Sequence, residues 1–260
     1  MTAAPQPPPA SGLLRGKTAV ITAAAGSGIG SAAARRMLDE GARVLISDHH
    51  ERRLEATRAE LAALPGAEVA AVRCDVTDEE QVHALLDTAA AEFGGIDVFV
   101  NNAGLGGTAS IVDMTDEEWG RVLDVTLNGA FRCTRAAVRR FREQGGGGAV
   151  VNNASVVGWR AQAGQAHYAA AKAGVMALTR CAAMDAAEFG VRINAVAPSL
   201  VMHPNLAKVT DDDMLAELES REAFGRSAEP WEVANVMVFL ASDYSSYLTG
   251  EVLSASSQHP

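Results

Sequence analysis

The stretch "KTAVITAAAGSGIGSAAARRML", residues 17–38, decides the fold. An apolar run ends at Thr22, a loop of small residues follows, and an alanine-rich helical pattern begins near Ile29. Small residues at such a junction let backbone N–H groups at a helix N-terminus approach a phosphate. The stretch therefore predicts a strand–loop–helix unit that cradles a dinucleotide. The residues expected to contact that dinucleotide are Thr22, Gly26, Ser27, Gly28 and Ile29.

The rest of the chain repeats this alternation. Strands are predicted at 18–22, 43–47, 68–74, 96–101, 148–155, 192–197 and 251–256, and helices at 29–40, 50–63, 78–93, 116–143, 166–189, 211–222 and 230–241. Apolar strands that alternate with helices are typical of a parallel sheet covered on both faces. We expect one α/β domain over 13–260, a doubly wound parallel sheet of the Rossmann type with about seven strands. A proline-rich arm, 1–12, is expected to be disordered before it.

Composition excludes several classes of protein. The formal net charge is −10, from 22 Lys and Arg against 32 Asp and Glu, which argues against a nucleic-acid surface. The three cysteines have no metal-ligand spacing, so no metal site is predicted, and they are expected to be buried small hydrophobes in a reducing compartment. No apolar run approaches the roughly 20 residues of a membrane span, and the start lacks signal-peptide features. We expect a cytoplasmic protein with no membrane partner.

Polar and small residues follow the predicted strands. In a doubly wound sheet, ligands bind beyond the carboxyl ends of the strands, so these residues should surround the cofactor. They are Asp48, Asp75, Val76, Asn102, Ala103, Gly104, Ser155 and Pro198. The alternative for Asn102 is a structural role in a turn.

Tyr168 and Lys172 stand at i and i+4 of one predicted helix, and Ser155 ends the strand before it. A phenol near pKa 10 is a poor acid–base group at neutral pH, and an adjacent lysine, aided by an oxidised nicotinamide ring, favours the phenolate. Ser155 is positioned to donate a hydrogen bond to a substrate oxygen on which charge develops. The three side chains predict acid–base catalysis at a substrate oxygen.

Asp48, at the end of the second strand, favours NAD over NADP. Its carboxylate can accept hydrogen bonds from both ribose hydroxyls and repels a 2′-phosphate. Ser27, beside Gly28, is not basic. Arg52 and Arg53 weaken the argument unless they face solvent on the next helix.

Taken together, these motifs make the chain similar to the short-chain dehydrogenase/reductase family. The matching segments are the glycine loop, "CDVT" at 74–77, "NNAG" at 101–104, "YAAAK" at 168–172, "RINAVAP" at 192–198 and "ASDYSSYLTGEVL" at 241–253. The resemblance implies that Tyr168 exchanges the proton and that Lys172 holds the ribose hydroxyls and lowers the tyrosine pKa. It also implies that Ser155 orients the substrate oxygen and that Asp75 touches the adenine. A homotetramer built on the two long helices is expected.

The chain departs from the family pattern at several positions. Thr22 to Gly30 spans nine residues where the family's T-G-x-x-x-G-x-G has eight, and Ala23 replaces the first glycine. Thr126 stands where the family usually has a relay asparagine, and Asn128 is two residues away, on another side of the helix. His203 replaces a threonine that meets the nicotinamide amide, and either binds that amide or a substrate, or is an ordinary loop histidine. The tail reads "SSQHP" in place of a glycine pair.

The substrate segment is expected at 199–227, as a helical lid, with Arg160 and Arg226 as candidate cations. The segments "TAAAGSGIG", "SDHHERRL", "EAFGRSAEPWEV" and "QHP" are similar to those of an actinobacterial subgroup. That likeness implies a small-molecule hydroxy or keto substrate in steroid and cholesterol ring catabolism, of the hydroindanone-propionyl-CoA type. The alternatives are a 3-oxoacyl thioester reductase of the fatty-acid type that uses NADPH, and a cofactor-binding relative without activity.

Overall fold

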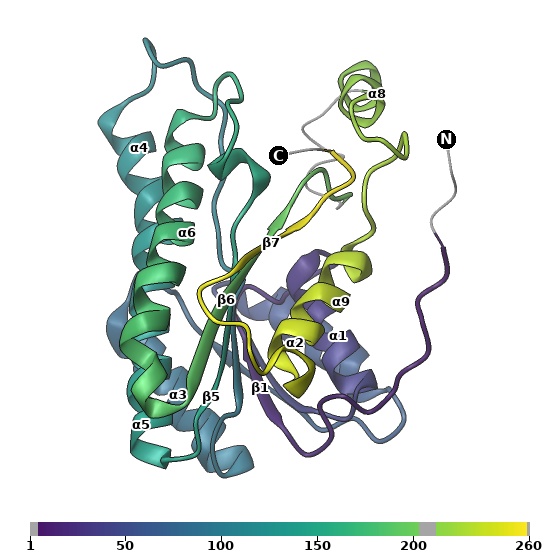
Figure 1. Cartoon of the computed structure of the whole chain (residues 1–260), viewed down its shortest axis with the longest axis vertical. Coiled ribbons are helices and arrows are strands. Elements are labelled where there is room, and N and C mark those ends of the chain that lie inside the picture. Colours follow the sequence, from purple (N-terminus) through teal and green to yellow (C-terminus); the bar gives the residue numbers. More distant parts are fainter. Residues whose placement is uncertain (1–4, 203–211, 259–260) are drawn as a thin grey trace.

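A computed structural model describes residues 5–202 and 212–258 (Figure 1). Its centre is a seven-stranded sheet in the order β3-β2-β1-β4-β5-β6-β7, in which all neighbouring strands are parallel. The strands are β1 (Thr18–Ile21), β2 (Arg43–Asp48), β3 (Val69–Arg73), β4 (Val98–Asn101), β5 (Gly148–Asn153), β6 (Val191–Pro198) and β7 (Val252–Ala255). The predicted doubly wound α/β fold is confirmed.

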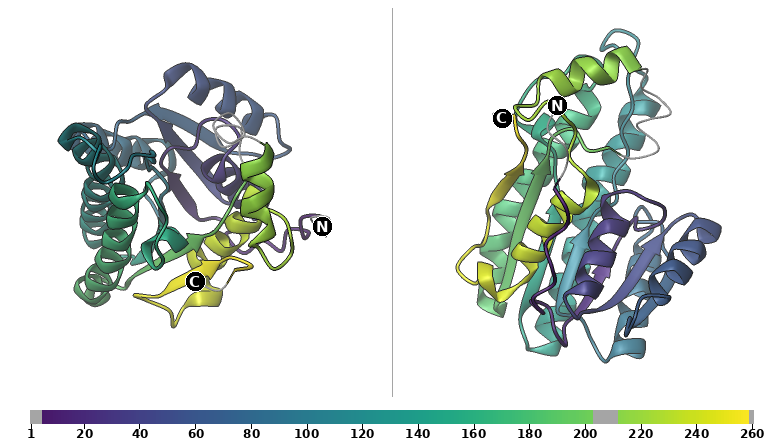
Figure 2. Two further views of the ribbon diagram at one scale, coloured as in Figure 1. Left: turned by 90° about the horizontal axis from the view of Figure 1, so that it is seen from above. Right: turned by 90° about the vertical axis from the view of Figure 1, so that its right-hand side faces the viewer.

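Helices cover both faces of the sheet because successive strand residues point to opposite sides. Ala19 and Ile21 of β1 pack with α1 (Ile29–Asp39), α2 (Glu51–Ala62) and α9 (Pro230–Ala241). Val20, between them, packs with α3 (Glu79–Phe93), α5 (Gly129–Gln144) and α6 (Ala166–Ala186) on the other face. The views in Figure 2 show the sheet between these two helical layers.

The predicted helix at 116–143 is interrupted. It consists of α4 (Asp116–Leu123), a π-helical turn at Asp124–Asn128 and then α5. Such a turn inserts one extra residue into the helix and is frequent at functional sites. Thr126 lies in this turn.

The predicted lid is described only in part. It contains α8 (Asp212–Ser220), close to the predicted helix at 211–222. Residues 203–211, and with them His203, lie outside the described residues. Within the described part, no helix is long and apolar enough to cross a membrane.

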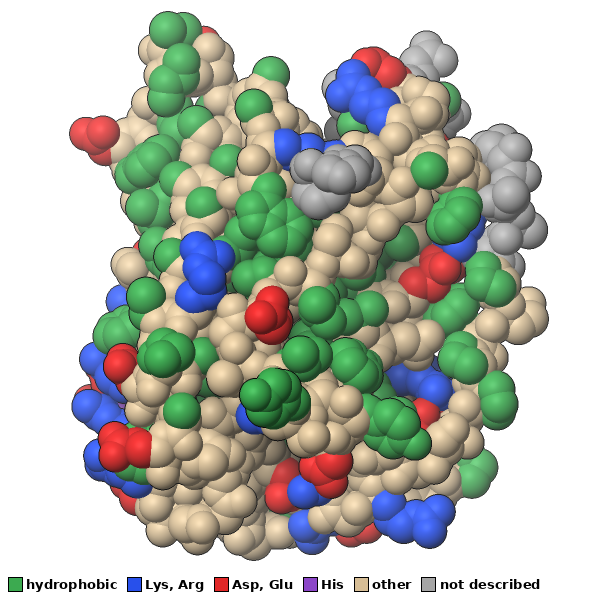
Figure 3. Space-filling view, viewed as in Figure 1, with side chains coloured by type: hydrophobic (Ala, Val, Ile, Leu, Met, Phe, Trp, Pro, Cys, Tyr) green, Lys and Arg blue, Asp and Glu red, His purple; other side chains and the backbone are tan. Residues whose placement is uncertain are grey.

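Hydrophobic side chains also lie on the outer surface, over the region where Figure 1 places α6 (Figure 3). Phe131 on α5 is 44% exposed and Met184 on α6 is 76% exposed. Cys181, on the same outer side of α6, is exposed. The prediction that all three cysteines are buried is therefore wrong for Cys181, which stands two residues from the buried Thr179 and Ala183 and so faces away from the core.

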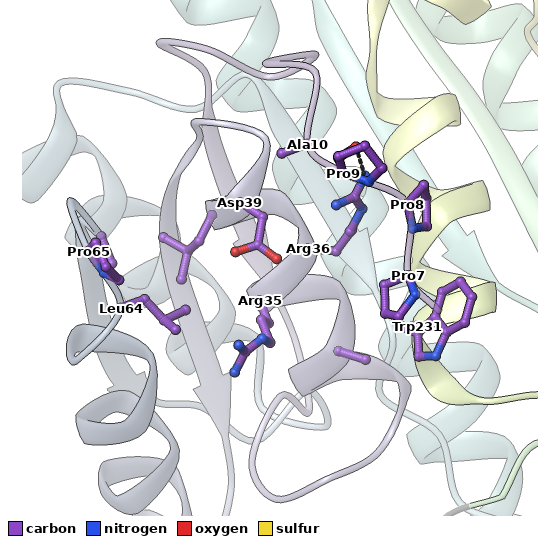
Figure 4. A pocket seen from close by; sticks show the side chains of 13 residues that line it. Pro7, Pro8, Pro9, Ala10, Arg35, Arg36, Asp39, Leu64, Pro65 and Trp231 are labelled. Atoms are coloured by element: carbon purple, nitrogen blue, oxygen red, sulfur yellow. Dashed lines mark hydrogen bonds between the residues drawn. The ribbon is translucent and has the colours of Figure 1, made fainter. Parts of the chain in front are cut away.

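The described part of the N-terminal arm, 5–12, has no regular secondary structure and ends against a buried carboxylate. Glu40 accepts hydrogen bonds from the backbone N–H groups of Ser11 at 3.0 Å and Leu13 at 2.9 Å. A cavity of about 590 Å³ lies between the arm, α1 and Trp231 of α9 (Figure 4). It contains none of the predicted site residues, so it is not where the chemistry is expected.

Candidate active site

The loop between β1 and α1, which we call the cradle, is hydrogen-bonded to β2 and α2 on one side and is open on the other. The N–H of Ala25 donates to Asp48 Oδ2 at 3.3 Å, and that of Gly26 donates to Thr57 Oγ1 at 2.9 Å. A Cβ built on Gly26 or Gly28 would meet no atom within 4 Å, so open space faces these glycines. Gly28 is the N-cap of α1 and supplies no side-chain cap, which leaves the first N–H groups of the helix available to an anion. These features fit the pyrophosphate of a dinucleotide.

Ala23 carries the cost of the altered loop. Its φ is +51°, and within the described residues it is the one non-glycine residue with positive φ. This is the position at which the family has glycine, and the left-handed conformation costs an alanine roughly 1–2 kcal/mol. The nine-residue loop thus keeps the backbone path that a glycine would take.

Gly30 marks the closest packing in the cradle. A Cβ there would lie 2.5 Å from the carbonyl oxygen of Ala23 and 2.5 Å from Asn102 Nδ2. Only glycine fits such a contact, because real Cβ atoms do not approach other atoms so closely. The start of α1 is therefore locked against the segment after β4.

Thr22 and Asn102 were predicted to contact the cofactor, and the structure gives their side chains other partners. The Thr22 hydroxyl accepts hydrogen bonds from the N–H groups of Asn102 and Ala103 at 3.0 and 3.1 Å. Asn102 Nδ2 donates to the carbonyl oxygens of Thr22 and Ala23, and its Oδ1 accepts from Asn153 Nδ2. Both side chains tie the two loops together, which is the structural alternative for Asn102. Direct contact of Thr22 and Asn102 with the cofactor stays a prediction.

Asp48 ends β2 with a 6% exposed side chain. Its Oδ1 accepts from the N–H of His50 at 2.9 Å, and burial raises its pKa against the opposing hydrogen bond from Ala25. Arg53 Nη2 lies 4.0 Å from Oδ1 and is half-exposed, while Arg52 is exposed on α2. The carboxylate therefore stands beside the cradle as predicted, with one arginine at the edge of its range.

Asp75 and Val76 follow β3. Oδ1 of Asp75 accepts from the N–H and the hydroxyl of Thr77, at 3.0 and 2.8 Å, which leaves Oδ2 for another donor. Val76 is buried, and its Cγ2 would lie 2.7 Å from a Cβ on Gly129. Val76 thus contacts the start of α5 through its side chain.

Ser155, Tyr168 and Lys172 come together at the carboxyl end of β5. The side chains of Ser155 and Tyr168 are hydrogen-bonded to each other, and both line one cavity. Lys172 Nζ donates to the carbonyl oxygen of Asn153 at 2.6 Å and lies 5.5 Å from the centre of the Tyr168 ring. The predicted grouping of the three side chains is present in the geometry.

Burial is the largest effect on the pKa values of Tyr168 and Lys172 in the protein without cofactor. Burial raises the pKa of Tyr168, although the hydrogen bond from Ser155 opposes it. Burial also lowers the pKa of Lys172 to about 8, which weakens the positive charge expected to act on the phenol. In the protein without cofactor, burial is the largest effect on the pKa of Tyr168. That Lys172 lowers this pKa beside an oxidised nicotinamide ring stays a prediction.

The Thr126 side chain forms its hydrogen bonds with the backbone of Leu105. Its hydroxyl accepts from the N–H of Leu105 at 2.9 Å and donates to the carbonyl oxygen of Leu105 at 3.1 Å. It thereby fixes the segment that follows Gly104. A Cβ built on Gly104 would lie 3.4 Å from Lys172 Nζ, so this segment is close to the Lys172 ammonium. Asn128 is exposed and bonds Asp124, so it faces away from the site, as expected.

The cavity that holds Ser155 and Tyr168 has a volume of about 270 Å³. Ile29 connects it to the cradle, and Pro198 and Ser199 line it from the end of β6. Sequence reasoning missed four of its polar side chains: Gln162, Gln165, Glu222 and Gln258. Nothing in their spacing marked them, because they come from three segments far apart in the chain. In the described residues no His, Cys, Asp and Glu cluster could hold a metal.

Comparison with known proteins agrees with this geometry. The family model described as "Enoyl-(Acyl carrier protein) reductase" matches residues 23–257. The (5R,7aS)-5-hydroxy-7a-methyl-1-oxo-2,3,5,6,7,7a-hexahydro-1H-indene-carboxyl-CoA reductase of Mycobacterium tuberculosis is 63% identical over 260 residues, 100% of this chain and 99% of its own. The cis-4-hydroxycyclohexanecarboxylate dehydrogenase of Sinomonas cyclohexanicum is 43% identical over 238 residues, 91% of this chain and 94% of its own. A crystal structure of a short chain dehydrogenase from Mycobacterium smegmatis has a TM-score of 0.89 and 59% identity, and 99% of each chain is covered.

Proposed function

The chain belongs to the short-chain dehydrogenase/reductase family of oxidoreductases, and on that premise we propose that it transfers a hydride between NAD(H) and a ring alcohol or ketone carried as a CoA thioester. The observation that carries the proposal is the cavity in which Ser155 and Tyr168 stand together, next to the cradle and above Lys172. It brings a proton donor, a hydrogen-bond donor and a cofactor site to one place.

The residues divide the work as follows. Bound NAD(H) supplies the hydride chemistry. Tyr168 gives its hydroxyl proton to the substrate oxygen during reduction and takes it back during oxidation. Ser155 donates a hydrogen bond to the same oxygen as negative charge develops there. Lys172, held by the carbonyl of Asn153 at 2.6 Å, binds the ribose hydroxyls.

Asp48 supports NAD as the cofactor. Its carboxylate is buried at the end of β2 and already accepts two backbone N–H groups, so it cannot move away from a ribose phosphate. A 2′-phosphate there would place like charges in contact. Arg53, at 4.0 Å, is the residue that would favour NADP instead.

The relatives support the substrate class. Two of them are named for ring compounds, a hexahydroindene carboxyl-CoA and a hydroxycyclohexanecarboxylate. A cavity of about 270 Å³ suits one small ring system, with the CoA moiety outside it. We therefore place the reaction in steroid ring breakdown, on a hydroindanone-type thioester.

A homotetramer is also proposed. The exposed Phe131 and Met184 on α5 and α6 supply apolar surface that a partner subunit would cover.

The test is a fluorescence titration with NADH and NADPH, followed by turnover of a hydroindanone thioester. We expect tighter NADH binding and turnover with NADH. Tyr168→Phe should keep NADH binding and lose turnover by at least about 100-fold. NADPH preference together with 3-oxoacyl thioester reduction would establish the fatty-acid-type alternative, and unchanged turnover in Tyr168→Phe would refute the proton transfer.

A further inference from the structure

Arg160 lines the active-site cavity from the segment after β5. Its backbone N–H donates to the carbonyl oxygen of Val156 at 3.1 Å, which fixes it five residues beyond Ser155. The cavity contains both Arg160 and Tyr168. A guanidinium thus faces the same space as the reacting hydroxyl groups.

The guanidinium has spare hydrogen-bonding capacity. Its Nη1 donates to Gln258 Oε1, and in the described part of the chain no carboxylate forms an ion pair with it. Within the described residues, no hydrogen bond is found from its Nε or Nη2, so both groups can donate to a ligand. Arg226, the other candidate cation, is taken by a two-point bond to Glu232 at 2.7 and 2.8 Å.

A buried carboxylate completes the arrangement. Glu222, 4% exposed, accepts from Gln258 Nε2 at 3.1 Å and from the Ser257 hydroxyl at 2.7 Å. Gln258 therefore bridges Glu222 and Arg160 and fixes the guanidinium from the C-terminal tail. The positive and negative charges balance, so this wall of the cavity offers N–H donors without a net charge.

We propose that Arg160, positioned by Gln258 and Glu222, binds the neutral acyl carbonyl oxygen of the thioester and thereby selects a thioester over the free carboxylic acid. The inference rests on the proposed function and adds the residue that reads the acyl group. A carboxylate ligand would meet the negative charge of Glu222 across one glutamine, whereas a carbonyl oxygen needs only the donors.

The experiment uses three ring ketones that share the reacting ring: a thioester, the free acid, and the ring without an acyl group. Arg160→Met should raise KM for the thioester by roughly 10–100-fold, the effect of one hydrogen bond to a charged donor, and change the ring without an acyl group less than about 3-fold. Arg160→Lys should fall between, because the ammonium lacks the planar fork. Arg221→Met removes an exposed guanidinium that pairs with Glu217 outside the cavity, and serves as the matched control.

Glu222→Gln tests the charge balance. Removing the carboxylate leaves Arg160 uncompensated, so the free acid should gain several-fold relative to the thioester. Gln258→Met should raise KM for the thioester while kcat stays near the wild-type value, as a positioning residue requires. NADH affinity should be unchanged in every variant, which confirms folding.

Calorimetric binding of the ketone thioester to the enzyme–NAD⁺ complex, in which no hydride is available for the ketone, separates the two proposals. A thioester that binds with dependence on Arg160 but is not turned over refutes the proposed function and keeps the inference. A thioester that is turned over equally well by wild type and Arg160→Met refutes the inference alone. Equal losses on all three ketones would assign Arg160 a structural role, and a wild type that neither binds nor turns over the thioester refutes both.

Discussion

At the scale of the residue, two residues in the site have unfavourable conformational or burial energies that the surrounding structure maintains. Ala23 is held at positive φ, and Lys172 is buried with one hydrogen bond to a backbone carbonyl. Both costs are local, and both lie beside the expected cofactor. Such strain persists where neighbouring contacts determine the conformation. Here the Ala23 carbonyl oxygen packs against Gly30 and accepts a hydrogen bond from Asn102 Nδ2.

Ala23→Gly should therefore stabilise the protein by about 0.5 kcal/mol. The left-handed backbone costs alanine roughly 1–2 kcal/mol, which glycine would relieve. The greater conformational freedom of glycine in the unfolded chain opposes this gain by about 0.4–1 kcal/mol. Urea unfolding measures the change. Ala24→Gly, at a buried position without positive φ, is the control and should destabilise; a loss of stability in both variants would contradict the strain.

Lys172 makes stability depend on pH. Its pKa in the folded protein is about 8, below the ordinary 10.5, so between these values the unfolded chain binds more protons. The free energy of unfolding should therefore rise between about pH 8 and 10.5 in the protein without cofactor, as the penalty on the buried ammonium is relieved. Urea unfolding across that range should show the rise, and Lys172→Met should remove it. A wild-type slope that the variant retains would assign the effect to another group.

At the scale of the element, one carboxylate joins three segments. Glu40, at the end of α1, binds Arg36 at 2.6 Å and the N–H groups of Ser11 and Leu13, and Arg36 Nε reaches Asn235 of α9 at 2.9 Å. Although burial opposes it, the hydrogen bond from Leu13 and its neighbours lowers the pKa of Glu40. The α1–α9 layer is thus fastened at the end remote from the cradle.

Glu40→Gln should destabilise the protein by about 2–3 kcal/mol, because buried N–H donors and Arg36 lose a charged acceptor. NADH affinity should change less than about 2-fold, since no cradle residue contacts Glu40. Urea unfolding and a fluorescence titration measure the two quantities. Glu55→Gln, which breaks an exposed pair with Arg58, should leave the free energy of unfolding almost unchanged. An equal loss of stability in both variants would be evidence against a stabilising role of the Glu40 hydrogen bonds.

At the scale of the whole molecule, the two faces of the sheet differ in what covers them. The α1–α9 face receives the arm, whereas the outer surface of α5 and α6 keeps exposed hydrophobic side chains (Figure 3). An apolar helix face of this kind is typical of a subunit interface. The assembly that we propose would bury it.

A Phe131→Glu, Met184→Glu double variant should be monomeric in light scattering at concentrations where the wild type is a tetramer. Each glutamate would bring an unpaired charge into an apolar interface, which is costly. Arg58→Glu, on the exposed side of α2, is the control and should leave the mass unchanged. A wild type that is itself a monomer would contradict the proposed assembly.

The sequence by itself determined the layered α/β fold, because nearly continuous apolar strands separated by amphipathic helices have few other ways to bury their surface. All seven strands were found within a few residues of prediction, and the Tyr168–Lys172 spacing placed both groups on one helix face. Local pattern was enough for these features. It also located Asp48 at the end of β2.

Only the tertiary structure decided which side chains of the site bond to one another and how deeply they are buried. It showed that Thr22 and Asn102 tie loops together, that burial raises the pKa of Tyr168 against the hydrogen bond from Ser155, and that Glu222 and Gln258 hold Arg160. Each of these depends on partners that lie from tens of residues to nearly a hundred residues away. Hydrogen bonds and desolvation act through space, and the spacing of residues along a chain does not record which distant groups will meet.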